Sequence, residues 1–323
     1  MSQAAVPIDV VAEVRAAEER ARAHLLTTPA VPAVGLSREV GSSVVLKCEN
    51  LQHTGSFKAR GAVSKILSLT PEELDRGVIT ASTGNHGAAV SYAGSIVGVS
   101  PTVVVPETAN PAKLAAIERL GGRIEVHGSD SVDSELGARR AAEERAMTFV
   151  SPYNDPAVIG GQGTLGLELL DQVDELSAIY VAVGGGGLSS GVAGIVKSVS
   201  PETRVIGCSP AASAVMYHSL RAGHILDMPS DPTLSDGTAG GVEPGAITFD
   251  VLDALLDDFV TVEEADIRTA FLDLIEVEHL LVEGSAAMAY AAARAHAKAS
   301  TGTIAVILCG GNIGVEKLRA VLG

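Results

Sequence analysis

Short apolar runs alternate with longer stretches of helical spacing along nearly the whole chain. The runs are rich in Val, Ile and Ala, and they occupy residues 43–47, 77–81, 102–105, 123–126, 178–183, 204–208, 258–262 and 303–308. Between many of them, apolar residues recur at intervals of three and four, the spacing of a helix with one buried face. Short continuous strands separated by helices are typical of parallel sheets covered on both faces. The pattern therefore predicts an α/β protein.

The pattern also predicts the first helix, the domain organisation and one long loop. The first thirty residues predict one amphipathic helix, ended by Thr28-Pro29, because their apolar positions keep helical spacing: Ile8, Val11, Val14, Ala17, Ala21 and Leu25. No low-complexity linker separates two halves, so we expect domains that share chain crossings. Residues 228–245 form the longest irregular stretch. Such a loop is either an active-site wall or a plain surface loop.

Composition excludes several classes of protein. The 323 residues fit one large or two modest domains, and their hydrophobic fraction of 46% is far from that of a disordered chain. A net charge of −16 disfavours nucleic acid as a partner. The N-terminus lacks the apolar core of a signal peptide, and apolar runs elsewhere are too short to span a membrane.

The cysteines indicate a reducing environment. Cys48, Cys208 and Cys309 are odd in number, lie far apart and form no CxxC or His/Cys cluster. Neither a disulfide framework nor a zinc site is indicated. We expect a cytoplasmic protein.

Four consecutive glycines follow the strand expected at 178–183 and precede a helix that begins near Leu188. Without side chains, backbone N–H groups can converge on a small anion, and the positive end of the helix adds to the attraction. The spacing matches neither GxGxxG nor a Walker loop, so a monophosphate ligand is favoured over a dinucleotide or nucleoside triphosphate. The alternative is a tight strand-to-helix turn without a ligand.

Two more segments follow expected strands. Residues 82–87 offer hydroxyl, amide and N–H donors that suit a carboxylate or a phosphate, although ordinary helix capping is the alternative. Lys58 begins a helix after the strand at 43–47. Most lysines are simply solvated, but open α/β sheets bind ligands at the carboxyl ends of their strands. A phosphorylated aldehyde cofactor, held by a Schiff-base lysine, would use both Lys58 and the glycine run.

Four motifs occur in order: KCENLQHTGSFKARGA at 47–62, STGNHG at 82–87, GGGGL at 184–188 and CGGN at 309–312. From about Val10 to its C-terminus the chain resembles the serine/threonine dehydratase and serine racemase family of fold-type II pyridoxal 5′-phosphate enzymes. The resemblance implies two open, twisted, mainly parallel sheets flanked by helices. It also implies a large cofactor-binding domain from residues 1–75 and 152–323, a smaller inserted domain at 76–151, and a cofactor in the cleft between them. A homodimer is implied as well.

The resemblance implies roles for individual residues. Lys58 holds the cofactor and, once released, acts as the base on the substrate Cα–H, while Thr83 is the second catalytic candidate. The other implied cofactor contacts are Phe57, Asn85, Gly184, Gly185, Gly186, Gly187, Leu188, Gly237, Glu283 and Cys309. The implied substrate contacts are Ser82, Thr83, Gly84, Asn85, His86 and Tyr153. For Tyr153 a packed core role is an equal alternative, and for Glu283 a surface or capping role is the alternative.

Two departures from the family pattern change the expected chemistry. Racemases of the family have a serine where this chain has Thr83, whose added methyl stiffens χ1 and puts racemisation in doubt. Relatives often have a cation-binding glutamate where this chain has Ser209. With Ser209, Ser213 and Val215 in that region we expect no metal site, because hard cations prefer charged oxygen ligands.

The reaction expected is β-elimination from a β-hydroxy amino acid of the L-threonine or L-serine class, giving a 2-oxo acid and ammonia. The chain ends at Gly323, soon after the last motif. We therefore expect a catabolic enzyme without the regulatory domain of biosynthetic threonine dehydratases. The alternatives are a dehydratase for a larger or acidic substrate, such as 3-hydroxyaspartate or a hydroxyectoine-derived amino acid, a serine racemase, a β-replacement enzyme, and a non-catalytic protein that binds pyridoxal phosphate or an amino acid.

Overall fold

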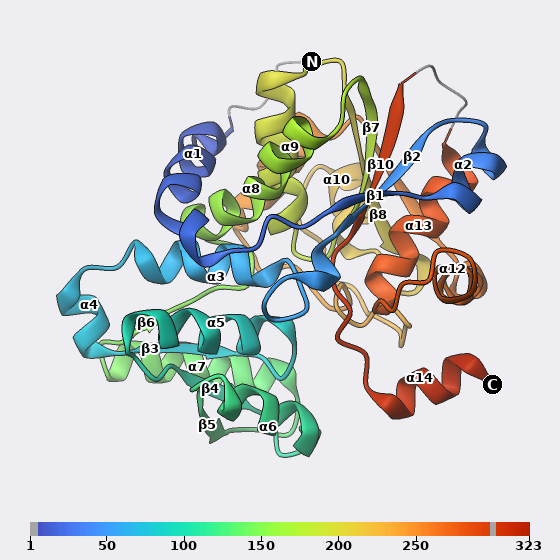
Figure 1. Ribbon diagram of the computed structural model, residues 1–323. Helices are drawn as coiled ribbons and strands as arrows, with labels where there is room; N and C mark the ends of the chain where they lie inside the picture. Colours follow the sequence, from blue (N-terminus) through green and yellow to red (C-terminus); the bar gives the residue numbers. More distant parts are fainter. Residues whose placement is uncertain (1–5, 298–301) are drawn as a thin grey trace.

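The chain forms two separate sheets, each flanked by helices (Figure 1). The structure is a computed structural model that describes residues 6–297 and 302–323. The larger sheet lies in the upper body of Figure 1 and the smaller sheet in the lower body. None of the described helices is long and apolar enough to cross a membrane.

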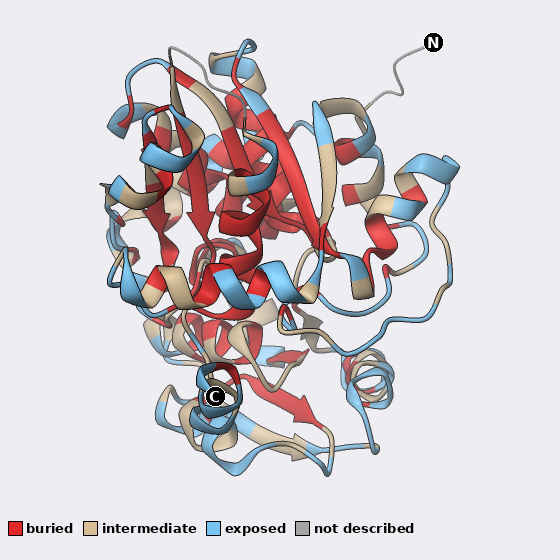
Figure 2. Cartoon of the chain, turned by 90° about the vertical axis from the view of Figure 1, so that its right-hand side faces the viewer, coloured by how far each residue is buried: buried red, intermediate tan, exposed pale blue. Residues whose placement is uncertain are grey.

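The larger sheet has six strands in the order β1-β2-β10-β7-β8-β9. Their bounds are β1 (Ala30–Pro32), β2 (Val44–Cys48), β7 (Leu176–Ala182), β8 (Arg204–Pro210), β9 (Asp258–Val262) and β10 (Thr303–Leu308). Only β1 runs antiparallel to its neighbour, and Val306 of β10 lies between Leu46 of β2 and Tyr180 of β7. These central strands are buried on both sides (Figure 2), as their continuous apolar sequence requires.

The smaller sheet has four parallel strands in the order β5-β4-β3-β6. Their bounds are β3 (Val78–Ala81), β4 (Thr102–Val105), β5 (Arg123–Val126) and β6 (Thr148–Phe149). All four lie inside residues 76–151, the range expected for the inserted domain. The exact domain boundaries stay a prediction.

Helices cover both faces of the larger sheet (Figure 1). On one face α1 (Val10–Ala21), α8 (Pro156–Gln172) and α9 (Gly187–Val199) pack together, and on the other lie α12 (Glu264–Glu276) and α13 (Gly284–His296). Shorter helices at the margins are α2 (Val34–Val40), α10 (Val215–Ala222), α11 (Ile247–Leu255) and α14 (Val315–Leu322). Single 3-10 turns are η1 (Arg22–His24), η2 (Glu49–Leu51) and η3 (Ala211–Ser213).

The smaller sheet is flanked by α4 (Pro71–Arg76), α5 (Asn85–Val97), α6 (Pro111–Arg119) and α7 (Ser131–Glu144). Between the two bodies lies α3 (Lys58–Leu67), which packs against α5 on one side and α8 on the other. The helix that begins at Lys58 therefore contacts both halves of the molecule.

The hydrophobic pattern predicted most elements closely. Strands β4, β5, β9 and β10 have the expected bounds, and the ends of the other expected strands differ by two residues or fewer. The first helix is shorter than expected: α1 ends at Ala21 and continues only as the turn η1. Strands β1 and β6 were not predicted, because runs of three and two residues carry no recognisable period.

A buried group of charges fixes the position of α3. The Arg60 guanidinium and the Glu49 carboxylate are both fully buried, and Arg60 Nε donates to Glu49 Oε2 at 2.7 Å. Arg60 Nη1 also donates to Glu168 Oε1 of α8 at 2.8 Å, and Lys47 Nζ of β2 donates to Glu168 Oε2 at 2.7 Å. Burial alone would raise the pKa of the Glu168 carboxyl, but hydrogen bonds and charge from Arg60 and Lys47 hold it at about 2. This group joins β2, α3 and α8.

Replacing Arg60 tests how far the structure depends on this group. Arg60→Met should lower the free energy of unfolding by about 3–5 kcal/mol, because Glu49 would remain buried without its counter-charge. Urea unfolding measures the effect. The control is Arg204→Gln, which breaks the exposed pair with Asp258 and should change stability by less than about 1 kcal/mol. Equal effects of the two substitutions would contradict the interpretation.

Candidate active site

A large cleft lies where strands of both sheets end. Its volume is about 1930 Å³, and its walls include residues that follow β2, β3, β7 and β10, together with residues 236–244 of the irregular loop. Parallel α/β sheets bind ligands at the carboxyl ends of their strands. The stretch at 228–245 is thus partly a wall of the cleft.

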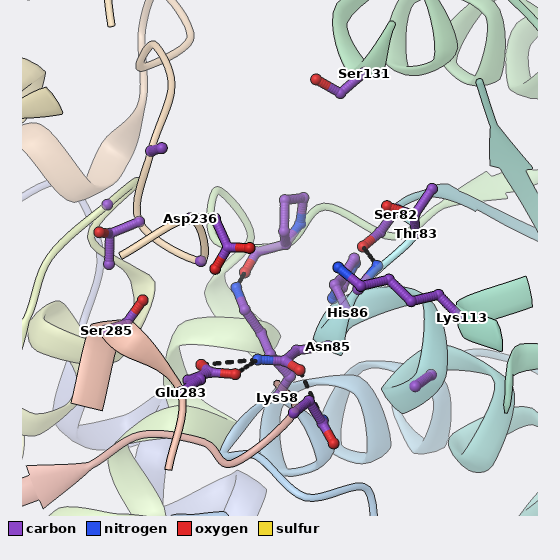
Figure 3. Close-up of a pocket in the computed structure, with 18 of the residues that line it drawn as sticks. Lys58, Ser82, Thr83, Asn85, His86, Lys113, Ser131, Asp236, Glu283 and Ser285 are labelled. Atoms are coloured by element: carbon purple, nitrogen blue, oxygen red, sulfur yellow. Dashed lines mark hydrogen bonds between the residues drawn. The ribbon is translucent and has the colours of Figure 1, made fainter. Parts of the chain in front are cut away.

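Lys58 reaches the cleft from the first position of α3 (Figure 3). Its Nζ donates to the Pro152 carbonyl at 2.8 Å and lies 5.1 Å from the centre of the Phe57 ring. Desolvation by the surrounding walls lowers the pKa of the Lys58 ammonium from 10.5 to about 8, and smaller electrostatic effects of the neighbouring Cys309 and Glu283 oppose this shift only in part. Near neutral pH a minor fraction of Lys58, far larger than for an ordinary lysine, is therefore the neutral amine that a nucleophile or base requires.

The second wall is the start of α5. This helix begins at Asn85, so Asn85 and His86 lie in its first turn. No side chain caps this turn, and the Ser82 hydroxyl accepts only the Gly84 N–H, at 3.1 Å. An uncapped helix N-terminus presents free N–H groups and a positive dipole end to an anion. Ser82, Thr83, Gly84, Asn85 and His86 all line the cleft here.

His86 is neutral at this position. Burial lowers its pKa to about 3, and the charge of Lys58 acts in the same direction. Nε2 lies 3.0 Å from the Val150 carbonyl, which only accepts, so Nε2 carries the proton and Nδ1 is left as an acceptor. Nδ1 has no hydrogen-bond partner among the described residues. The donors for an anion at this turn are therefore backbone N–H groups rather than the imidazole.

Glu283 lies at the floor of the cleft between two predicted cofactor contacts. Asn85 Nδ2 donates to both Glu283 oxygens, at 3.0 and 2.9 Å (Figure 3). Cys309 Sγ lies 3.8 Å from Glu283 Oε1. Burial raises the pKa values of both the Glu283 carboxyl and the Cys309 thiol. The side-chain oxygen Oδ1 of Asn85 accepts from Asn312 Nδ2 at 2.7 Å. Asn85 thus already has protein partners, and its contact with the cofactor stays a prediction.

The four glycines form a cradle that side chains would fill. A Cβ on Gly185 would lie 2.3 Å from Tyr153 Cδ1, and one on Gly184 would lie 2.9 Å from Thr238 Cα. Gly186 has φ +90°, a conformation that favours glycine. Helix α9 begins at Gly187 without a side-chain cap, and Leu188 behind it is buried. The bare N–H groups of this helix start suit a phosphate.

The remaining predicted contacts lie on the loop side of the cleft. Gly237 faces Ser285 and Glu283, and a Cβ there would lie 2.9 Å from Ser285 Oγ. Tyr153 packs its ring on the glycine cradle, while its hydroxyl accepts the Glu243 N–H at 2.9 Å. Its predicted contact with substrate is untested, and here the hydroxyl is directed at the loop.

Several cleft residues were not predicted. Figure 3 shows Lys113 of α6 pointing into the cleft from the side of Ser82 and Thr83. Three further lining residues lie on other elements: Ser131, Asp236 and Ser285. The Lys113 ammonium makes no ion pair or hydrogen bond with the described residues. Only the fold brings these positions together, so no local signal identified them.

The expected absence of a metal site is not tested by the structure. Ser209 Oγ donates to the Val183 carbonyl at 2.8 Å, and Ser213 Oγ lies 2.6 Å from Ser230 Oγ. Within residues 6–297 and 302–323, no group of three or more His, Cys, Asp or Glu side chains is placed to hold a metal ion.

The cleft thus places a lysine of lowered pKa between two uncapped helix starts, one of them a glycine cradle. This arrangement fits a phosphorylated aldehyde cofactor and defines a class of enzyme that holds such a cofactor through lysine. The comparisons agree: residues 22–310 match the model of the pyridoxal-phosphate dependent enzyme family, and the chain belongs to that family. Pyridoxal 5′-phosphate is therefore its cofactor.

Individual relatives cover most of the chain. An L-threonine ammonia-lyase of Geobacter sulfurreducens is 38% identical over 310 residues, which are 96% of this chain and 77% of the relative. A serine racemase of Arabidopsis thaliana is 36% identical over 94% of this chain and 93% of the relative. Among solved structures, the processed threonine deaminase isoform 2 of Solanum lycopersicum has a TM-score of 0.94 at 32% identity, covering 99% of this chain and 94% of that one.

The glycine cradle can be tested by adding one methyl group. Gly185→Ala should weaken the binding of pyridoxal phosphate about tenfold or more, because the new Cβ would displace the Tyr153 ring. Equilibrium dialysis of the apoprotein measures the dissociation constant. Gly241→Ala is the matched control, since a Cβ there meets nothing within 4 Å. Unchanged binding in Gly185→Ala would contradict the assignment of the cradle.

The lowered pKa of Lys58 predicts a pH dependence for cofactor capture. The neutral amine attacks the aldehyde, and its fraction rises as the pH rises through about 8. The rate at which apoprotein captures pyridoxal phosphate should therefore rise with a midpoint near pH 8 and level off at higher pH. Stopped-flow absorbance measures this rate, and a midpoint near the ordinary lysine value of 10.5 would contradict the burial argument.

Proposed function

We propose that this enzyme converts a β-hydroxy amino acid of the L-threonine or L-serine class into a 2-oxo acid and ammonia. The observation that carries the proposal is the position of Lys58, a half-buried amine with a pKa of about 8 between the glycine cradle and the start of α5. The names of the relatives, L-threonine ammonia-lyase and threonine deaminase, support the same reaction.

Each end of the cofactor has a matching group in the cleft. Lys58 would hold the aldehyde end, and the N–H groups of residues 184–187 would hold the phosphate. When bound, pyridoxal phosphate supplies an electron sink that weakens the substrate Cα–H bond. The protein must supply the base, the orientation of the substrate and the control of protons.

Lys58 and the start of α5 supply the base and the orientation. The substrate carboxylate would bind the free N–H groups near Gly84, Asn85 and His86. The His86 imidazole is neutral, so these backbone groups rather than a charged side chain would hold the carboxylate. Neutral Lys58 then removes the proton from Cα. Elimination of the β-hydroxyl as water leaves an unsaturated amine, and its hydrolysis consumes one water and gives the 2-oxo acid and ammonia.

The floor of the cleft favours elimination over amino-group transfer. Burial keeps Cys309 a neutral thiol by raising its pKa. A neutral thiol does not hold a proton on a neighbouring ring nitrogen as a carboxylate would, which disfavours long-lived carbanions and favours prompt loss of the β-hydroxyl.

We further propose a homodimer in the cytoplasm. Cys48, Cys208 and Cys309 are free and buried, as suits a reducing compartment. Leu51 and Leu281 are each 51% exposed, and Asn50 beside Leu51 donates to the Leu281 carbonyl, so the segments that carry the two leucines lie side by side. These exposed leucines would form part of the interface.

The reaction can be tested with purified holoenzyme and its Lys58→Ala variant. The cofactor bound to wild type should absorb at about 410–420 nm, and the enzyme should form 2-oxo acid from L-threonine or L-serine. Lys58→Ala should lower this rate about 10³-fold, because it removes both the cofactor attachment and the base. Coupled detection of the 2-oxo acid measures the rate, with L-threo-3-hydroxyaspartate included to test acidic substrates.

Lys65→Ala is the matched control, because Lys65 lies on the same helix but pairs with Asp155 outside the cleft. Activity that survives in Lys58→Ala would overturn the proposal. Chiral analysis of the remaining serine tests the racemase alternative. Formation of D-serine without 2-oxo acid would show that the enzyme racemises serine instead of dehydrating it. In that reaction the Thr83 hydroxyl would act from a different wall of the cleft than Lys58 (Figure 3).

A further inference from the structure

One ion pair joins the two sides of the cleft. Arg139 lies on α7, in the smaller body, and Glu243 lies on the irregular loop of the larger body. Arg139 Nη2 donates to Glu243 Oε2 at 2.5 Å, although the two residues are 104 positions apart. Both line the cleft. The pair therefore ties a helix of one body to a loop of the other across the site.

Arg139 is held in place from its own side. Its guanidinium lies 4.5 Å from the centre of the Phe149 ring, and it also donates to Glu135 one turn earlier on α7, at 2.8 Å. A guanidinium fixed by stacking and a second carboxylate loses less freedom when it binds Glu243.

The backbone of Glu243 also contacts Tyr153. The Glu243 N–H donates to the Tyr153 hydroxyl at 2.9 Å, and burial raises the pKa of that hydroxyl to about 12, so it stays protonated. The Tyr153 ring packs on Gly185, and its backbone lies against Gly187. The same residue thus contacts the loop at one end and the glycine cradle at the other.

The neighbouring helix reinforces this contact. The Ile247 N–H at the start of α11 donates to Asn154 Oδ1 at 2.9 Å, and Thr248 Oγ1 donates to the Gly185 carbonyl at 2.6 Å. A shift of the loop at Glu243, four residues before α11 begins at Ile247, would therefore move two supports of the cradle together.

We propose that Arg139, Glu243 and Tyr153 form a latch that positions the glycine cradle for the cofactor phosphate. Arg139 and Glu243 are positioning residues: they act through Tyr153, whose ring sets the shape of the cradle. The latch rests on cofactor binding in this cleft and is independent of which amino acid the enzyme converts.

The test measures cofactor affinity in the absence of substrate. Arg139→Gln and Glu243→Gln should each raise the dissociation constant of pyridoxal phosphate about fivefold, as expected for a partly exposed ion pair. The double variant should resemble either single variant, because both substitutions break the same pair. Tyr153→Phe keeps the ring and removes the acceptor, and it should also weaken binding about fivefold.

Controls separate positioning from a loss of structure. Arg139→Lys keeps the charge and should recover most of the affinity. Arg145→Gln breaks a pair with Glu125 inside the smaller body, at 2.8 Å, and should leave the dissociation constant unchanged. The thermal unfolding midpoint of each apoprotein should match wild type.

Several results would overturn the latch. These are unchanged cofactor affinity in Arg139→Gln and Glu243→Gln, an equal loss in Arg145→Gln, or a loss of affinity that only follows lowered apoprotein stability. If wild type binds the cofactor but converts none of the amino acids tested, the proposed reaction fails while the latch is still decided by these affinities.

Discussion

The buried guanidinium of Arg60 is the constraint on which the rest of the site depends. A fully buried positive charge is tolerated only with close counter-charges, and here Glu49 and Glu168 supply them from two different elements. Arg60 is two residues after Lys58 on the same helix. The ion pairs that neutralise Arg60 therefore also fix where Lys58 enters the cleft. The same buried ion pairs therefore stabilise the core and position the reactive amine.

The chemistry of the cleft follows from two properties of its walls: helix N-termini that attract anions and burial that disfavours charged side chains. Two helices, α5 and α9, begin at the cleft without side-chain caps, so each offers N–H groups to an anion. Between them, desolvation makes Lys58 a weaker base that is partly neutral near physiological pH, and it keeps His86 neutral. The site thus offers backbone dipoles to negative groups and leaves Lys58 as the side chain suited to proton transfer near neutral pH.

Sequence reasoning succeeded where the signal is local. The apolar runs gave β4 and β10 within a residue, and the position of Lys58 at a helix start followed from the strand before it. It failed for β1 and β6, which are held by neighbouring strands rather than by their own pattern. It also missed the contact between Asn85 and Glu283, 198 positions apart, because only the closed fold brings such residues together.

The most direct test of the central claim is to locate the cofactor on the chain. Borohydride reduction of the holoenzyme makes the bond between the cofactor aldehyde and its lysine permanent, and mass spectrometry of the digested protein then identifies the modified residue. The account predicts modification of Lys58 alone. Modification of another lysine of the cleft, such as Lys113, or the absence of any modified lysine in a protein that retains the cofactor, would contradict it.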